Sequence, residues 1–176
     1  PLLPVAGPVP GPPVGWTPLV ASPRLAEQLG VAQFYVKDEG RCASGSLKDR
    51  ASSVVLARAV LENVQNVVAA SSGNAAASTA LLAAQLGFRC RFYVPRTIPR
   101  AKLAQLTIFG AETLLVDGGY DAAYQLSVSA TKRHGWYNRN TGYNPFTREG
   151  KKTVAFEICE QLRWEVPDLV VVPVGD

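Results

Sequence analysis

The chain has 176 residues, of which 47% are hydrophobic and 18% are charged, and a formal net charge of +4. This length fits one average domain or two small ones, and the composition is typical of a globular chain, not of a disordered one. No apolar run approaches the roughly 20 residues of a membrane-spanning helix, so we expect no membrane partner. The basic residues are scattered, which disfavours a nucleic-acid partner and favours a small anionic ligand.

The cysteines and the histidine form no pattern typical of a metal site or a disulfide framework. Cys42, Cys90 and Cys159 are odd in number and widely spaced, and His134 is the only histidine. Such spacing favours reduced thiols. Residues 1–13 lack the basic and apolar regions of a secretion signal, so we expect a cytoplasmic protein. The chain contains no methionine and stops directly after an apolar run, so we expect it to be part of a longer protein.

Short apolar segments alternate with helical patterns along the chain. In chain order, the pattern predicts a helix at 25–29, a strand at 34–37, a helix at 46–61, a strand at 66–70, a helix at 75–86, a strand at 89–94, a helix at 100–109, a strand at 113–116, a helix at 120–134, a short strand at 136–137, a helix at 150–164 and a strand at 168–174. Several of these helices end at a glycine, which readily adopts the left-handed conformation of a helix end.

The predicted strands are apolar on both sides, as in a sheet that helices cover on both faces. Together with the regular alternation of strand and helix, this predicts an α/β fold with a parallel, twisted sheet and right-handed connections. Binding sites in such sheets form at the carboxyl ends of the strands. We therefore expect the functional loops to follow Lys37, Ala70 and Val174.

The first candidate motif is the run Ala-Ser-Gly-Ser-Leu-Lys-Asp-Arg at residues 43–50. It places Lys48 at the start of a helix, directly after a turn that contains glycine. The partial positive charge of a helix N-terminus disfavours an ammonium ion and so favours the amine that forms an imine with an aldehyde. The structural alternative is a serine cap followed by a solvated lysine. The chain has no phosphate-binding GxxxxGK[ST] loop and no GxSxG motif.

The second candidate motif is the polar turn Ser-Ser-Gly-Asn at residues 71–74, between a predicted strand and an alanine-rich helix. Free backbone N–H groups at such a helix start bind a carboxylate or a phosphate. The Asn74 amide is also a candidate donor to a phenolate oxygen. The structural alternative is an ordinary capped helix.

The third candidate motif, at residues 144–153, brings the cations Arg148, Lys151 and Lys152 close to one helix start. They are candidates for binding an anionic group of a substrate, and the structural alternative is a solvated basic loop.

Taken together, five motifs resemble those of threonine synthases, within the pyridoxal-phosphate enzymes of the tryptophan-synthase-β type (fold type II). They are Gly-Trp-Thr-Pro-Leu at 15–19, Ser-Gly-Ser-Leu-Lys-Asp-Arg at 44–50, Ser-Ser-Gly-Asn at 71–74, Glu-Gly-Lys-Lys-Thr at 149–153 and Val-Pro-Val-Gly at 172–175. Their order and approximate spacing match over residues 15–176. As a set they are highly specific for fold type II and less specific for threonine synthase within it.

The resemblance implies a two-domain fold type II enzyme of which the C-terminal part is absent here. Residues 1–50 and 144–176 would belong to a large domain that binds pyridoxal 5'-phosphate, and residues 51–143 would form a nested small α/β domain. It also implies a homodimer for the full-length protein.

The resemblance further implies the roles of individual residues. Lys48 is the catalytic residue and holds pyridoxal phosphate as a Schiff base. Asn74 hydrogen-bonds the 3-hydroxyl oxygen of the cofactor, and Gly175 opens the loop that cradles the cofactor phosphate. The implied substrate-binding residues are Ser71, Ser72, Gly73, Ala75, Arg148 and Lys151.

The implied activity is that of a lyase that converts O-phosphohomoserine and water into threonine and phosphate. One departure leaves the substrate open. Where the family pattern has Asn-Pro-aromatic-Arg, this chain has Thr147 after Phe146, and Arg148 follows one place later. The family arginine grips the substrate phosphate, a task that suits its bidentate fork. The alternatives are a serine or threonine dehydratase, a β-replacing synthase and, from another class, a non-catalytic α/β binding module.

Overall fold

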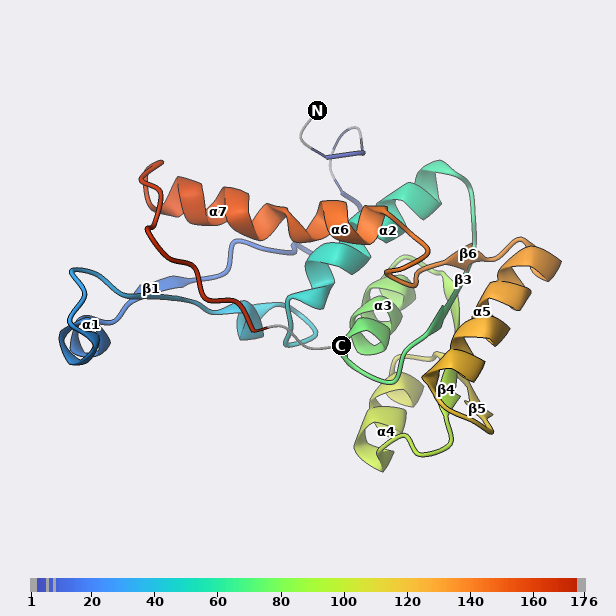
Figure 1. The fold of residues 1–176 in the computed structure, drawn as a ribbon. Helices are drawn as coiled ribbons and strands as arrows, with labels where there is room; N and C mark the ends of the chain where they lie inside the picture. The colour runs from blue at the N-terminus through green and yellow to red at the C-terminus, as the bar shows by residue number, and fades with distance from the viewer. Residues whose placement is uncertain (1–2, 6, 8, 174–176) are drawn as a thin grey trace.

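The computed structural model describes residues 3–5, 7 and 9–173 (Figure 1). The strands of its core are β3 (Asn66–Ala70), β4 (Arg89–Pro95), β5 (Glu112–Val116) and β6 (Tyr137–Asn138). They form one parallel sheet in the order β5-β4-β3-β6. The chain builds the sheet outward from β3 through β4 to β5, and then returns to place β6 on the other side of β3. The direction of the strand order therefore reverses between β3 and β6, and such a reversal is where ligands bind in open parallel sheets.

Three helices connect these strands and cover the sheet. They are α3 (Asn74–Gln85), α4 (Arg100–Ile108) and α5 (Tyr120–His134). Figure 1 shows α3 and α4 on one face and α5 on the other. Since strand side chains alternate between faces, β4 sends Phe92 and Val94 into the core beneath α3 and α4 and Tyr93 towards α5. Burial on both faces explains why β3 is apolar from Val67 to Ala70, whereas the side of β4 that faces α5 also carries Arg89 and Arg91.

A second layer of helices lies beside this unit. Its members are α2 (Lys48–Leu61), α6 (Phe146–Lys151) and α7 (Thr153–Gln161), with Lys152 in helical conformation between the last two. Ten of the fourteen residues of α2 are buried, because α2 packs against α3 on one side and α6 on another. Helix α2 therefore joins the sheet unit to α6 and α7 (Figure 1).

The N-terminal part of the chain forms a separate two-stranded ribbon. Strands β1 (Leu19–Ala21) and β2 (Tyr35–Lys37) pair antiparallel, with the helix α1 (Pro23–Leu29) between them, and a short 3-10 turn, η1 (Glu39–Arg41), follows. The sequence predicts only parallel pairing, so this ribbon differs from the expectation. Gly30 ends α1 with φ +66°, a left-handed conformation that lets the chain turn back towards β2.

The predicted α/β fold with a parallel sheet is confirmed, and two elements differ from the prediction. In place of the helix predicted at 150–164, α6 begins at Phe146 and α7 ends at Gln161. The strand predicted at 168–174 is wrong for 168–173, which form no regular structure. A strand needs a partner, and no described strand flanks this segment, so the side chains of Leu169 and Val171 stay 78% and 83% exposed.

The division into residues 1–50 with 144–176 and a nested unit at 51–143 stays a prediction. Within the described ranges, no helix has the length and apolar character that crossing a bilayer requires. The three cysteines are free thiols, and Cys42 and Cys90 are buried.

Candidate active site

Lys48 is the first residue of α2, as the sequence predicts, and the loop before it is tied to the helix. The Asp49 carboxylate accepts hydrogen bonds from the Ser44 amide at 2.7 Å and from the Ser44 hydroxyl. Gly45 adopts φ +76°, which glycine tolerates best, and its amide donates to the Cys42 carbonyl at 2.8 Å. Hydrogen bonds therefore hold the backbone that carries the Lys48 side chain in place.

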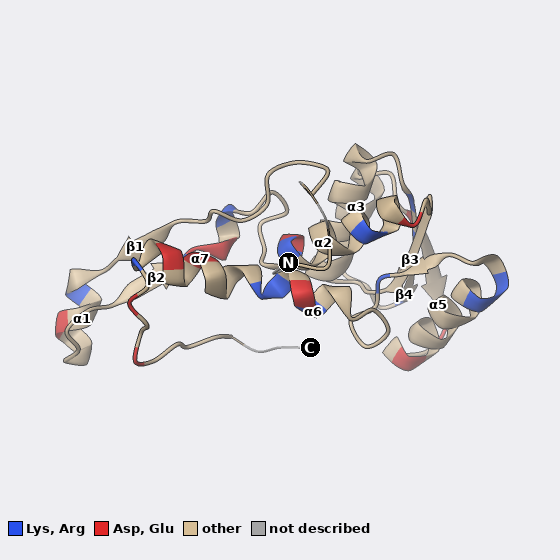
Figure 2. Cartoon of the chain, turned by 90° about the horizontal axis from the view of Figure 1, so that it is seen from above, with Lys and Arg blue, Asp and Glu red and all other residues tan. Residues whose placement is uncertain are grey.

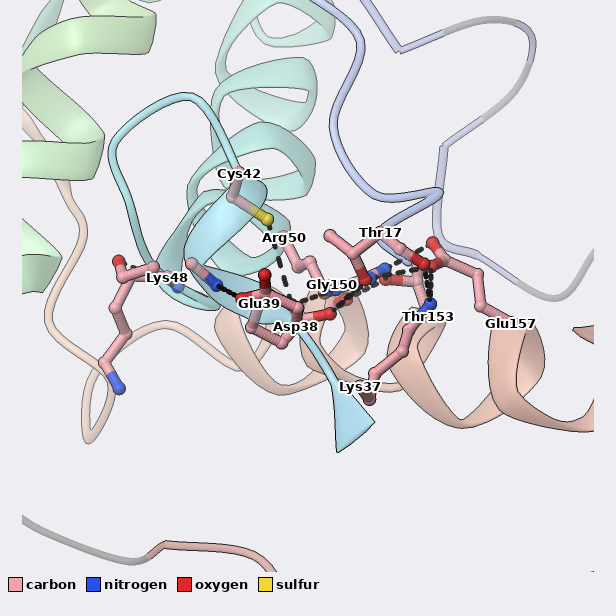
Figure 3. Close-up of polar contacts among 12 residues, drawn as sticks. Thr17, Lys37, Asp38, Glu39, Cys42, Lys48, Arg50, Gly150, Thr153 and Glu157 are labelled. Atoms are coloured by element: carbon pink, nitrogen blue, oxygen red, sulfur yellow. Dashed lines mark hydrogen bonds and ion pairs between the residues drawn. The ribbon is translucent and has the colours of Figure 1, made fainter. Parts of the chain in front are cut away.

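The Lys48 ammonium makes no hydrogen bond and no ion pair with the residues that the structure describes. The side chain is partly buried, and Figure 3 shows it pointing away from the polar network around Arg50. A lysine without a carboxylate partner is available for reaction with an aldehyde.

The turn after β3 leads directly into α3, as predicted, and presents free donors there. The Ser71 hydroxyl accepts a bond from the Gly73 amide at 3.4 Å. Helix α3 begins at Asn74, and the first N–H groups of a helix have no partner inside it. The amides of Asn74 and Ala75 donate to no acceptor in the described part of the chain. They are placed to bind a carboxylate, the role predicted for the segment Ser71, Ser72, Gly73 and Ala75.

Helices α2 and α3 begin at the same end of the molecule (Figure 1). One turn into each helix, Ser78 donates to Ser52 Oγ at 2.8 Å, and Ser52 Oγ lies 3.1 Å from Thr79 Oγ1. Ser52 is four residues after Lys48, and Ser78 is four residues after Asn74. Lys48 and Asn74, the key residues of the two predicted motifs, therefore each lie one helical turn before this contact between α2 and α3.

Asn74 is exposed, and its side-chain oxygen accepts a hydrogen bond from Lys102 Nζ in α4 at 3.1 Å. This bond fixes which end of the amide faces Lys102 and leaves the Nδ2 group as a donor. The predicted role of Asn74 towards a cofactor oxygen stays a prediction. Gly175, predicted to open a phosphate loop, lies outside the described residues.

The loop after β6 contributes a residue that the sequence interpretation missed. Arg139 follows β6 directly, and its amide donates to the Val68 carbonyl of β3 at 2.9 Å. The side-chain oxygen of the next residue, Asn140, accepts from the Ala70 amide at 2.8 Å. Arg139 therefore lies at the carboxyl edge of the sheet, between β3 and β6, where the strand order reverses.

Three asparagines hold this loop. The Asn140 amide group donates to Ser127 Oγ at 2.7 Å, and the Asn144 amide group donates to the Asn138 carbonyl at 2.9 Å. The Asn138 side chain accepts from the Asn140 backbone amide at 2.9 Å and donates to the Thr131 hydroxyl at 3.0 Å. The bonds run to α5 and across the loop, so the backbone that carries Arg139 is rigid.

Four cations lie near one another where α6 packs against α2. Burial lowers the pKa of Lys151, and the charges of Lys48, Arg139 and Arg148 lower it further. None of the four joins an ion pair with a described residue. An accumulation of positive charges that join no ion pair with described residues is suited to an anionic ligand.

The structure separates the predicted basic residues into different environments. Lys151 is partly buried, whereas Arg148 is exposed. Lys152 is neutralised by Glu149 at 2.6 Å. Thr147, at the position where the family pattern has arginine, is fully buried and donates to the Asn144 carbonyl at 2.8 Å. The shift by one residue therefore does redirect the arginine, from the interior to the surface.

A buried ion network supports the helix that carries Lys48 (Figure 3). Arg50 is 1% exposed and donates to Glu39 at 2.7 Å and 2.8 Å and to Glu157 Oε2 at 2.7 Å. Lys37 donates to the same carboxylate oxygen at 2.8 Å. The network joins β2, η1, α2 and α7, and Figure 2 shows charges of both signs meeting where α2 lies on α6.

The cations in this network keep the neighbouring carboxylates ionised. Burial raises the pKa of Glu157, but hydrogen bonds from Arg50 and Lys37 outweigh it and lower the pKa to about 2. Burial also acts against the Glu39 carboxylate, and Arg50 and Thr17 outweigh it, so its pKa is lowered. The network therefore stays ionised at neutral pH.

The fold agrees with the comparison to known families. The family model described as pyridoxal-phosphate dependent enzyme matches residues 11–176. The chain therefore belongs to the pyridoxal-phosphate-dependent enzymes, and its parallel sheet covered by helices is that of fold type II.

Within that family, the chain is similar to threonine synthases. It is 42% identical to the threonine synthase of Methanocaldococcus jannaschii and 39% identical to that of Bacillus sp. strain ULM1, over 92% of this chain in both cases. It spans only 40% and 46% of the lengths of these two relatives. It also superimposes on apo diaminopropionate ammonia lyase of Escherichia coli with a TM-score of 0.76 and 25% identity, over 84% of this chain and 48% of that one.

Proposed function

We propose that the chain is part of a lyase of the threonine synthase type, which converts O-phosphohomoserine and water into threonine and phosphate. The observation that carries the proposal is the unpaired Lys48 amine, one helical turn before the contact of α2 with α3, together with the free amides at the start of α3 and three further cations that join no ion pair with a described residue. The identity to threonine synthases supports the same reaction.

The residues present fit pyridoxal phosphate and an anionic amino-acid substrate. When bound, the cofactor supplies an electron sink for charge that develops on the substrate. Lys48 would attach to the aldehyde carbon through Nζ and move protons at the same atom. Asn74 would donate from Nδ2 to the ring hydroxyl oxygen, and Gly175, which lies outside the described residues, would open the phosphate loop. The residues that we propose for the substrate are Ser71, Ser72, Gly73 and Ala75 for the α-carboxylate and Lys151 for its second anionic group, whereas Arg148, which the sequence also predicts there, is exposed.

The second candidate is a related lyase or synthase that acts on an amino acid with an uncharged side chain. Thr147 favours it, because the buried hydroxyl there offers no charge for a phosphate. This candidate includes serine or threonine dehydratases and β-replacing synthases. A non-catalytic binding module is the candidate from another class, and it would have no use for the unpaired Lys48 amine. We further propose a homodimer for the full-length protein, which light scattering would test.

Replacing Lys48 by alanine is expected to remove the absorbance band that the holoenzyme shows near the edge of the visible range, and to lower kcat by about a thousandfold or more. The amine both attaches the cofactor and moves protons, so both signals depend on it. Absorbance spectra and phosphate release from O-phosphohomoserine measure the two effects.

The matched control is Lys132→Ala, on an exposed lysine in the last turn of α5, which should leave both signals unchanged. Retention of the band in Lys48→Ala would contradict the assignment of Lys48. Release of a keto acid from serine or threonine, without phosphate release from O-phosphohomoserine, would favour the second candidate.

A further inference from the structure

Arg139 is a buried cation whose charge no carboxylate in the described residues balances. Its side chain is 2% exposed, and it joins none of the ion pairs there. Its hydrogen bonds go to two hydroxyl oxygens, Thr79 Oγ1 at 2.8 Å and Ser52 Oγ at 3.5 Å. A buried charge is costly unless an opposite charge lies beside it. The arrangement is therefore that of a site that is completed by an anion.

The hydroxyl groups around Arg139 do not supply that negative charge. Ser78 donates to Ser52 Oγ at 2.8 Å, and Thr79 donates to the Ala75 carbonyl at 2.8 Å. Their protons are committed to one another and to the backbone, so the groups are neutral. A guanidinium has five N–H donors, and only two bonds from its side chain are made to this cluster.

The position of Arg139 in the sheet is that of a ligand-binding residue. It follows β6, and the free amides of Asn74 and Ala75 follow β3, its neighbour in the sheet. Both segments lie at the carboxyl ends of their strands, on the two sides of the point where the strand order reverses. Ligands in open parallel sheets bind in this crevice.

Lys151 approaches the same stretch of α2 from α6. A Cβ atom on Gly150 would lie 2.1 Å from the Arg50 carbonyl oxygen and 2.9 Å from the Ala51 Cα, so the two helix backbones touch here. The next residue of α2, Ser52, is the one that Arg139 contacts. The two cations therefore flank one turn of α2, and the field of Arg139 reaches the Lys151 ammonium.

We propose that Arg139 and Lys151 bind the phosphate group of the substrate, and that Arg139 is the specificity-determining residue in place of the arginine expected at position 147. This inference rests on the proposed function and narrows it to phosphate monoesters. Thr147 is buried and uncharged, and the neighbouring Arg148 is exposed, so neither provides an enclosed guanidinium. Lys151, which is partly exposed, meets the anion, and Arg139 supplies the buried charge and the donors that favour a phosphate over a hydroxyl.

The test is the affinity of the holoenzyme for inorganic phosphate, measured by calorimetry, in Arg139→Met and in the matched control Arg133→Met. We expect Arg139→Met to raise the Kd for phosphate and the KM for O-phosphohomoserine by at least about tenfold, with the cofactor band retained. Arg133→Met, which removes an exposed arginine in the last turn of α5, should change both by less than about threefold.

Phosphate affinity equal to the wild type in a folded Arg139→Met would overturn the inference. If that variant does not fold, Arg139→Lys keeps the charge but loses the fork, and it should weaken phosphate binding several-fold, whereas an unchanged Kd would overturn the inference. Loss of pyridoxal phosphate with unchanged affinity for inorganic phosphate would assign the anion to the cofactor and would also overturn it.

Failure of the proposed function gives a different result. A holoenzyme that binds phosphate through Arg139 but releases none from O-phosphohomoserine would contradict the reaction and support the anion site.

Discussion

Replacing Gly150 by alanine is expected to destabilise the protein by about 3 kcal/mol and to weaken phosphate binding by the holoenzyme. The added Cβ would lie 2.1 Å from the Arg50 carbonyl oxygen and 2.8 Å from its carbonyl carbon. Because these are backbone atoms of a buried helix, no rotation of a side chain relieves the overlap, and α6 must move away from α2. Lys151, the next residue, moves with it.

Urea denaturation and calorimetry with inorganic phosphate measure the two effects. The matched control is Gly142→Ala, in an exposed loop where the nearest atom to an added Cβ is the Tyr124 hydroxyl at 3.9 Å. That substitution should change the free energy of unfolding by less than about 0.5 kcal/mol. A Gly150→Ala protein as stable as the control would show that the close approach of α6 and α2 is not required.

The alternation of strand and helix was predictable because burial on both faces leaves a strong signal in the sequence. Strand β3 is apolar at every position after Asn66, β4 is apolar from Phe92 to Pro95, and a helical pattern follows each strand. Lys48 was predictable for a local reason: a turn with glycine precedes a helical pattern, and no contact between distant residues is needed to place it.

Arg139 was missed because its role depends on contacts that the sequence order hides. Its hydroxyl partners Ser52 and Thr79 lie 87 and 60 residues away along the chain. The available signal was an arginine directly after a short strand and between two asparagines, with no acidic residue nearby. Such a pattern usually belongs to a solvated loop. Only the contacts of Arg139 with α2 and α3, after the end of β6, show that its guanidinium is buried.

The strand predicted at 168–173 was wrong because the local pattern of a strand was present without the distant partner that a strand needs. Its apolar residues predict burial on both faces, but a pattern of side chains does not create the neighbouring strand that its backbone must pair with. Leu169 and Val171 are exposed because nothing in the described chain covers them. The start of α6 at Phe146 was missed because Pro145 and Gly150 suggest a loop. A proline directly before the first turn is nevertheless compatible with a helix start.

Breaking the ion network is expected to have the largest effect on stability. Arg50→Met should lower the free energy of unfolding by about 3–5 kcal/mol, because it leaves the partly buried Glu39 carboxylate without its cation and Glu157 with Lys37 alone. Arg50→Lys should recover only part of this loss, since a single ammonium cannot bond to both carboxylates as the planar fork does. Urea denaturation at pH 7 measures both, and a loss below about 1 kcal/mol in Arg50→Met would contradict the role of the network.

The same network predicts how stability depends on pH. The folded pKa of Glu157 is about 2, below its ordinary value of 4.5, so the folded state binds this proton less readily than the unfolded state. The contribution of Glu157 is therefore fully present above pH 4.5 and is lost as the pH falls towards 2.

Glu157→Gln should flatten the acid limb of the stability curve, measured by urea denaturation between pH 3 and 7. Glu27→Gln offers the control, because Glu27 is an exposed residue of α1 that joins none of the ion pairs among the described residues, and this variant should leave that limb as steep as in the wild type. Equal steepness in Glu157→Gln would mean that acid sensitivity arises elsewhere and that the network does not govern the stability of the helix that carries Lys48.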